Sequence, residues 1–152
     1  MMSLQPEIDA LCEAANRLLR LGLDGTPIYT DSFRELNADV YRQSETLFRK
    51  TASSDIEEAA LCKALLMGYS ATIYNHGDKD KKIQLVLDCS WNVLDRLPAS
   101  LLKCQLLVAC YAEVPEEELA KEAHAIIDSW NGKELTLEES EVIERLQLLE
   151  ED

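Results

Sequence analysis

Apolar residues recur at intervals of three and four along most of the chain. The first such segment runs from Leu4 to Leu19, and the pattern ends at Gly22 before a polar turn. This spacing places the apolar side chains on one face of an α-helix. Six further segments show the same pattern, and none alternates as a β-strand would. We therefore expect an all-α protein in which residues 1–152 form a single domain of six or seven helices.

Two helix arrangements are compatible with this pattern, a helical bundle and a short, repeat-like array of helical hairpins. A weak internal similarity favours the array, because the Leu and Tyr pattern of residues 65–69 returns in residues 107–111. A chance likeness between two helices of a bundle explains the same observation. In either arrangement the third helix should lie at the centre, since its middle, at residues 61–74, is apolar nearly all round.

Helix-start signals mark three of the predicted elements. In the pattern Ser/Thr-x-x-Glu, the two side chains each accept a hydrogen bond from the other residue's backbone N–H. This pattern begins at Ser32, Ser54 and Thr136. We therefore expect the second, third and seventh helices to begin at these residues.

Acidic residues are concentrated towards the C-terminal end. The sequence has 29 Asp plus Glu against 15 Lys plus Arg, a net charge of −14. Residues 113–152 hold 14 acidic and 3 basic side chains, so this segment accounts for −11. Such charge opposes direct binding to nucleic acid, because attraction to phosphate supplies most of that affinity. The acidic helices of residues 113–152 act either as a solvated surface that maintains solubility or as one that steers a basic partner protein.

The sequence favours a cytoplasmic protein that does not bind membranes. Its apolar runs are only a few residues long, far short of the roughly 18 that a membrane span requires. Glu7, Asp9 and Glu13 interrupt the first apolar segment, so it does not have the pattern of a secretory signal peptide.

Five cysteines are the first candidates for chemistry. Their number is odd, they form no Cys-x-x-Cys pair, and each lies in an apolar stretch, which is typical of buried thiols in a reducing compartment. A reactive thiol also needs a base beside it, and His76 and His124 are the only histidines. The cysteines are Cys12, Cys62, Cys89, Cys104 and Cys110.

The second candidate is the junction from His76 to Asp80. A metal site could use His76, Asp78 and Asp80, but the same residues fit the end of one helix and the start of the next. No phosphate-binding loop, nucleophile elbow or zinc-hydrolase signature occurs. We therefore expect no enzyme, and no catalytic residue, cofactor or metal. The alternative is a small helical ligand- or metal-binding enzyme that uses the His76–Asp80 junction or a reactive cysteine.

Several stretches resemble the UpxZ family of small regulators. They are LGLDGTPIY at residues 21–29, ALLMGY at 64–69, LPASLLKCQLL at 97–107 and ELAKEAHAIIDSW at 118–130. The resemblance spans nearly the whole chain and is one of phrases, not of a catalytic signature.

The resemblance implies a transcription regulator. Members of this family are encoded in capsular-polysaccharide loci beside UpxY, an antitermination factor similar to NusG. UpxZ proteins oppose the antitermination factors of other loci, so that one capsule operon is transcribed at a time. It therefore implies an anti-antiterminator that acts by contact with a NusG-like protein, alone or together with RNA polymerase. No family motif identifies the binding residues.

Two surfaces are candidates for such a contact. The first is acidic, because a factor that works on polymerase and nascent RNA must itself have basic surface. The second is aromatic, and includes Tyr29 beside the turn at residues 24–27, although most of the other aromatic residues keep helical register with the core. We predict partner contacts at Glu113, Glu116, Glu117, Glu118, Glu122 and Tyr29. The other aromatic candidates are Tyr69, Tyr74, Trp91 and Tyr111.

Overall fold

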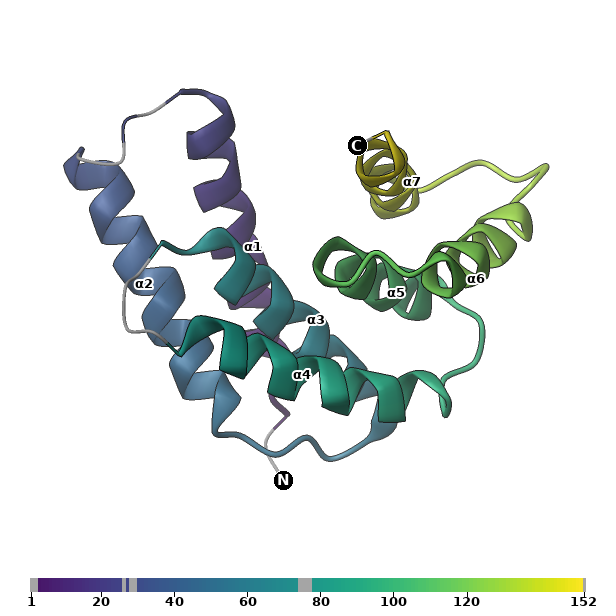
Figure 1. The fold of residues 1–152 in the computed structure, drawn as a ribbon, viewed down its shortest axis with the longest axis horizontal. Coiled ribbons are helices and arrows are strands. Elements are labelled where there is room, and N and C mark those ends of the chain that lie inside the picture. Colours follow the sequence, from purple (N-terminus) through teal and green to yellow (C-terminus); the bar gives the residue numbers. More distant parts are fainter. Residues whose placement is uncertain (1–2, 26, 28–29, 74–77, 152) are drawn as a thin grey trace.

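The computed structural model describes residues 3–25, 27, 30–73 and 78–151, and within these residues helices are the only regular secondary structure. The expectation of an all-α fold is therefore confirmed (Figure 1). The helices are α1 (Gln5–Leu23), α2 (Asp31–Phe48), α3 (Asp55–Ala71), α4 (Lys79–Leu94), α5 (Leu101–Glu113), α6 (Glu117–Asp128) and α7 (Leu137–Glu150).

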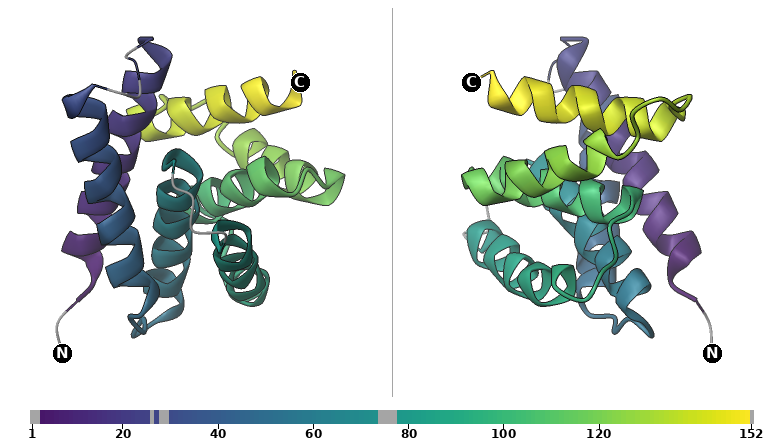
Figure 2. Two further views of the ribbon diagram at one scale, coloured as in Figure 1. Left: turned by 60° about the vertical axis from the view of Figure 1, so that its left-hand side comes forward. Right: turned by 90° about the vertical axis from the view of Figure 1, so that its right-hand side faces the viewer.

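Helix α3 is the element around which the others pack. It lies against α1, α2, α4 and α5, and α5 in turn packs against α6 and α7 (Figure 1). In the right-hand view of Figure 2, α5 lies between α4 and α7. In an array of hairpins each unit would touch only its neighbours along the chain. The substantial contacts among the described helices follow this rule, since the hairpins α1–α2, α3–α4 and α5–α6 and then α7 each pack on the next unit along the chain, which matches the array arrangement.

The central position of α3 follows from its sequence, as predicted. Ten of its 17 residues are buried, among them Leu61, Leu66 and the wholly buried Tyr69. A helix that is apolar on every side can satisfy all of its faces only by burial among other helices. The buried residues of α3 belong to one cluster of buried side chains that draws on all seven helices.

Side-chain caps fix the starts of four helices. Ser54 and Ser100 accept hydrogen bonds from the third residue of α3 and α5, at 3.1 and 3.2 Å. Thr136 and Glu139 form the complete reciprocal pair that the sequence predicts, with N···O distances of 2.9 and 3.1 Å. The prediction at Ser32 is wrong. Helix α2 begins two residues earlier, where Thr30 accepts from the backbone N–H of Phe33.

A polar cluster ties α2, α3 and α4 together. Glu45 of α2 accepts hydrogen bonds from the hydroxyls of Tyr69, at 2.6 Å, and Tyr41, at 3.0 Å, and forms an ion pair with Lys82 of α4. Burial works to raise the pKa of Glu45, but the hydrogen bonds from Lys82 and the two tyrosines outweigh it, so the pKa is lowered. The cluster stabilises the charged form of a partly buried carboxylate.

The glycine in the last turn of α3 allows α2 to approach closely. A Cβ atom placed on Gly68 would lie 2.2 Å from the Oγ of Ser44 and 3.2 Å from a methyl group of Leu11. Ser44 is itself held, since its hydroxyl donates to the carbonyl of Val40 at 2.8 Å. The crossing of α2 and α3 therefore requires a residue without a side chain at this position.

We predict that Gly68→Ala lowers the free energy of unfolding by about 1–3 kcal/mol, because the added methyl group forces α2 away from α3. Urea denaturation followed by circular dichroism measures this change. The exposed Ser140→Ala on α7 is the control and should change stability little. A Gly68→Ala protein as stable as the wild type would show that the close contact does not exist.

Glu57 fixes the N-terminal segment to the start of α3. Its carboxylate accepts from the backbone N–H groups of Ser53, at 3.0 Å, and Leu4, at 3.1 Å. These bonds, that from Ser53 foremost, hold the pKa of Glu57 below its ordinary value. The sequence predicted that Glu57 would accept from Ser54 in a reciprocal pair. Its carboxylate instead bonds one residue earlier.

We predict that Glu57→Gln lowers stability at neutral pH and that the difference disappears in acid. A carboxylate whose pKa is lower in the folded state stabilises the fold above its unfolded pKa of about 4.3, and this stability is lost as pH falls through the folded pKa. Urea unfolding midpoints of both proteins from pH 7 down to pH 3 measure the difference. A difference that stayed constant over this range would contradict the assignment.

Candidate partner-binding surface

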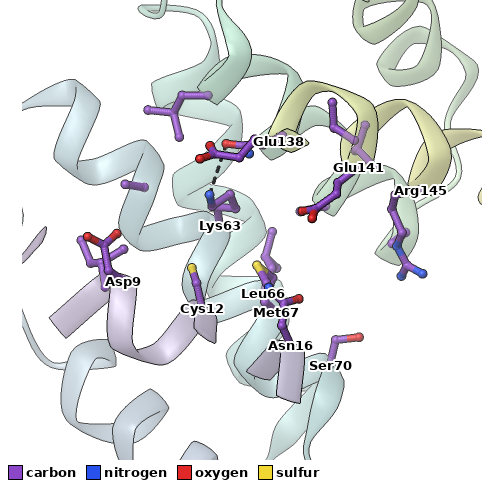
Figure 3. Close-up of a pocket in the computed structure, with 18 of the residues that line it drawn as sticks. Asp9, Cys12, Asn16, Lys63, Leu66, Met67, Ser70, Glu138, Glu141 and Arg145 are labelled. Carbon is purple, nitrogen blue, oxygen red and sulfur yellow. Dashed lines mark hydrogen bonds between the residues drawn. The ribbon is translucent and has the colours of Figure 1, made fainter. Parts of the chain in front are cut away.

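An open groove runs between four helices on one side of the protein. It has a volume of about 660 Å³ and is lined by residues of α1, α3, α5 and α7. Helices α3 and α5 form its floor, and α1 and α7 form its two walls (Figure 3). Over the described residues, α1 and α7 do not pack closely against each other, so the groove is open between them. We call it the α1–α7 groove.

The lining residues form one stripe along each helix. On α1 the stripe runs from Gln5 to Leu19, and on α3 it runs from Ile56 to Ser70, with members three or four residues apart. Fourteen residues of helix rise about 21 Å, so the groove follows about four helical turns. The α1–α7 groove is therefore elongated and not a local pocket.

The floor and one rim are apolar. Met67 and Ala109 are half-buried in the floor, next to the wholly buried Leu66, and Cys12 is half-buried in the α1 wall. Two larger apolar side chains at the rim are exposed to solvent, Leu19 by 43% and Ile56 by 63%. Apolar side chains this exposed along a concave surface are typical of a binding site.

The walls carry mainly negative charge. Asp9 of α1, together with Glu138 and Glu141 of α7, lines the two sides (Figure 3). Lys63 reaches from α3 across the floor and donates to the side-chain oxygen of Gln105 on α5 at 3.2 Å, the bond dashed in Figure 3. Arg145 is the other cation among the lining residues, against four carboxylates when Glu113 is included.

Glu113 is the predicted contact residue that lies in this groove. It is half-buried near the end of α5. Burial raises its pKa, and a hydrogen bond with Ser70 on the groove side of α3 works in the opposite direction. A carboxylate that has lost part of its hydration gains more from a cation than an exposed one does.

The other predicted glutamates lie outside the groove. Glu116, Glu117 and Glu118 are exposed around the start of α6, where free N–H groups favour carboxylates, as predicted. We call these three residues the α6 acidic turn. Glu122 has a structural partner, because its carboxylate lies 2.7 Å from the Nζ of Lys103 on α5. That ion pair joins α5 to α6.

Among the described residues, the aromatic candidates do not form an exposed patch. Tyr69 belongs to the core, as predicted, and Trp91 and Tyr111 are half-buried against it. Tyr29 and Tyr74 lie outside the described residues.

The alternative sites receive little support from geometry. His76 lies outside the described residues, and the described His, Cys, Asp and Glu side chains form no group of three placed to hold a metal ion. Burial raises the pKa of the thiols of Cys62 and Cys110 to about 12 and that of Cys104 to about 11, which disfavours the reactive thiolate. The expectation that every cysteine is buried is wrong for Cys89, which is exposed on α4.

Sequence reasoning missed the groove residues Asp9, Lys63, Glu138 and Glu141. Their helices were predicted, but which faces of α1 and α7 line the same groove depends on tertiary packing. One signal was present, since Asp9 and Lys63 interrupt apolar stripes and therefore had to lie at the edge of the core.

None of the described helices is long and apolar enough to cross a membrane.

The fold and the groove define an all-helical protein with a surface suited to contact with another chain. Residues 8–112 match the model of the UpxZ family of transcription anti-terminator antagonists. A crystal structure of a transcription anti-terminator antagonist UpxZ from Bacteroides uniformis ATCC 8492 is 45% identical, with a TM-score of 0.88. The similarity covers 99% of this chain and 94% of that one. No curated protein matches this sequence.

The chain therefore belongs to the UpxZ family, whose role is regulatory. The family match ends at Ala112. Three sides of the groove, α1, α3 and α5, lie largely within the matched residues, whereas the acidic α6 and α7 lie beyond them.

Proposed function

We propose that this protein inhibits NusG-like antitermination factors of capsular-polysaccharide operons other than its own. The observation that supports this most strongly is the likeness to an anti-terminator antagonist over almost the full length of both chains. In this proposal the protein acts in the cytoplasm by binding the factor, with or without RNA polymerase, and it carries out no chemistry of its own.

The charge of the surface supports contact with such a factor. A protein that works on polymerase and nascent RNA needs basic surface, because RNA is bound largely through its phosphates. The acidic helices α6 and α7 have the opposite sign, and their carboxylates at the start of α6 are exposed. An acidic surface that covers the basic one would compete with RNA or polymerase for it.

The α6 acidic turn is suited to steering. Exposed charges at a rim act mainly on the rate of encounter and on the choice of partner, and less on the lifetime of the complex. We assign Glu116, Glu117 and Glu118 this role. Glu122 contributes less, since Lys103 already neutralises it.

We predict that the protein co-purifies with NusG-like factors of other capsule operons and not with the factor of its own operon. The measurement is co-purification of tagged full-length protein with each factor, repeated as salt is raised, and binding should weaken with salt because the surfaces are oppositely charged. Equal binding to cognate and non-cognate factors, or to none, would overturn the proposed function.

We predict that the triple change Glu116→Gln, Glu117→Gln and Glu118→Gln lowers the association rate by up to about tenfold at low salt. The dissociation rate should change little, and the salt dependence of association should become flatter. Stopped-flow or surface-binding kinetics with a non-cognate factor measures both rates.

A variant of equal charge separates steering by this turn from net charge. It carries Glu13→Gln, Glu35→Gln and Asp88→Asn, three exposed positions on α1, α2 and α4. If this control slowed association as much as the first variant, the position of the α6 acidic turn would be irrelevant.

A further inference from the structure

We propose that the α1–α7 groove binds one amphipathic helix of the antitermination factor. The helix would lie with its apolar face on α3 and α5 and with Lys or Arg residues along the edges that face α1 and α7. This inference rests on the proposed function for the identity of the partner. The kind of segment that binds, an amphipathic helix with basic edges, is inferred from the shape and charge of the groove.

The shape of the groove suits a helix. Its stripes on α1 and α3 each extend over about four turns, roughly 21 Å, which is the length of an average helix in a globular protein. Helices pack with their axes 8–10 Å apart when the residues at the contact are small. Ala60, Ala109 and Ala112 line the groove and allow such an approach. A fifth helix would complete the packing that α1 and α7 do not make with each other.

The apolar pattern suits the same occupant. Leu19 and Ile56 lie at the rim with large fractions of their side chains in water, while Cys12 and Met67 are half-exposed below them. A helix with residues at i, i+3, i+4 and i+7 presents one apolar face to such a groove. Covering these four side chains removes exposed apolar area without disturbing the buried core.

Charge decides between the occupants that fit by shape. Asp9 on one wall and Glu138 and Glu141 on the other leave the walls negative, and the two lining cations are Lys63, which bonds to Gln105, and Arg145. A helix with basic edges gains an opposite charge on both sides. A second copy of this chain brings a net charge of −14 and is repelled. Nucleic acid is repelled for the same reason.

The first test changes the exposed apolar rim. We expect the double variant Leu19→Asn and Ile56→Asn to bind a non-cognate full-length factor at least about tenfold more weakly, mainly through faster dissociation. The matched control is Leu85→Asn and Leu148→Asn, whose side chains are 46% and 52% exposed but lie outside the groove. A groove variant that bound as tightly as the control would overturn the inference and leave the proposed function standing.

Thermal unfolding of each variant shows whether it is still folded. All four side chains are substantially exposed, so their replacement should leave the fold intact. If the groove variant nevertheless unfolds, the test is whether a bound factor protects Cys12 of the wild-type protein from alkylation.

Cys12 reports occupancy of the groove in the unmodified protein. Its thiol lines the groove and is half-buried, whereas Cys89 is exposed on α4 outside it. A bound factor should slow alkylation of Cys12 several-fold and leave Cys89 unchanged, as read by mass spectrometry of the two peptides. Equal rates at Cys12 with and without the factor would overturn the inference.

A synthetic probe separates the groove from the identity of the partner. The probe is a peptide of about 14 residues with Leu on one helical face and Lys on the other, and its controls are a scrambled peptide and one with Glu in place of Lys. Protection of Cys12 by the first peptide and by neither control supports the groove as a site for a basic helix, even if no antitermination factor binds. Equal protection by the scrambled peptide, or protection that depends only on the concentration of this protein, would overturn it.

Discussion

Burial of most of α3 is the constraint on which the rest of the structure depends. Ten of its 17 residues are buried, and α1, α2, α4 and α5 supply the covering surface, while the stripe from Ile56 to Ser70 forms part of the groove floor. Gly68 sets how closely α2 can approach, and the hydroxyl of Tyr69 finds its partner in Glu45 of that helix. Helices α6 and α7 have no part in covering α3, since they pack on α5. They are therefore free to carry the charge that a buried position forbids.

The helices could be predicted because local spacing determines them, and the groove could not because it depends on packing. The seven segments and the cap at Thr136 followed from side chains close in sequence. The start of α2 was placed at Ser32, because a capping signal was read without the competing Thr30 two residues earlier. The ion pair of Glu122 with Lys103 could not be predicted, because the two residues lie 19 positions apart on different helices.

The sequence predicted an acidic and an aromatic contact surface separately. The groove combines acidic and apolar side chains, and among the described residues Glu113 is the predicted contact that lines it. Leu19 and Ile56 lie at the rim of the same groove whose walls carry Asp9 and Glu141. Apolar area supplies affinity without direction, whereas charge selects the partner and its orientation. A groove that combines both can discriminate among proteins of similar fold by the basic residues that border one helix.

The same carboxylates oppose closure of the groove. Asp9 belongs to one wall, and Glu138 and Glu141 belong to the other, so closure of α7 onto α1 would bring like charges together and strip them of water. Apolar attraction across the gap is opposed by this cost. In the complex that we propose, a basic helix would remove this repulsion and cover the apolar floor, so the charge that opposes closure of the groove would also favour binding.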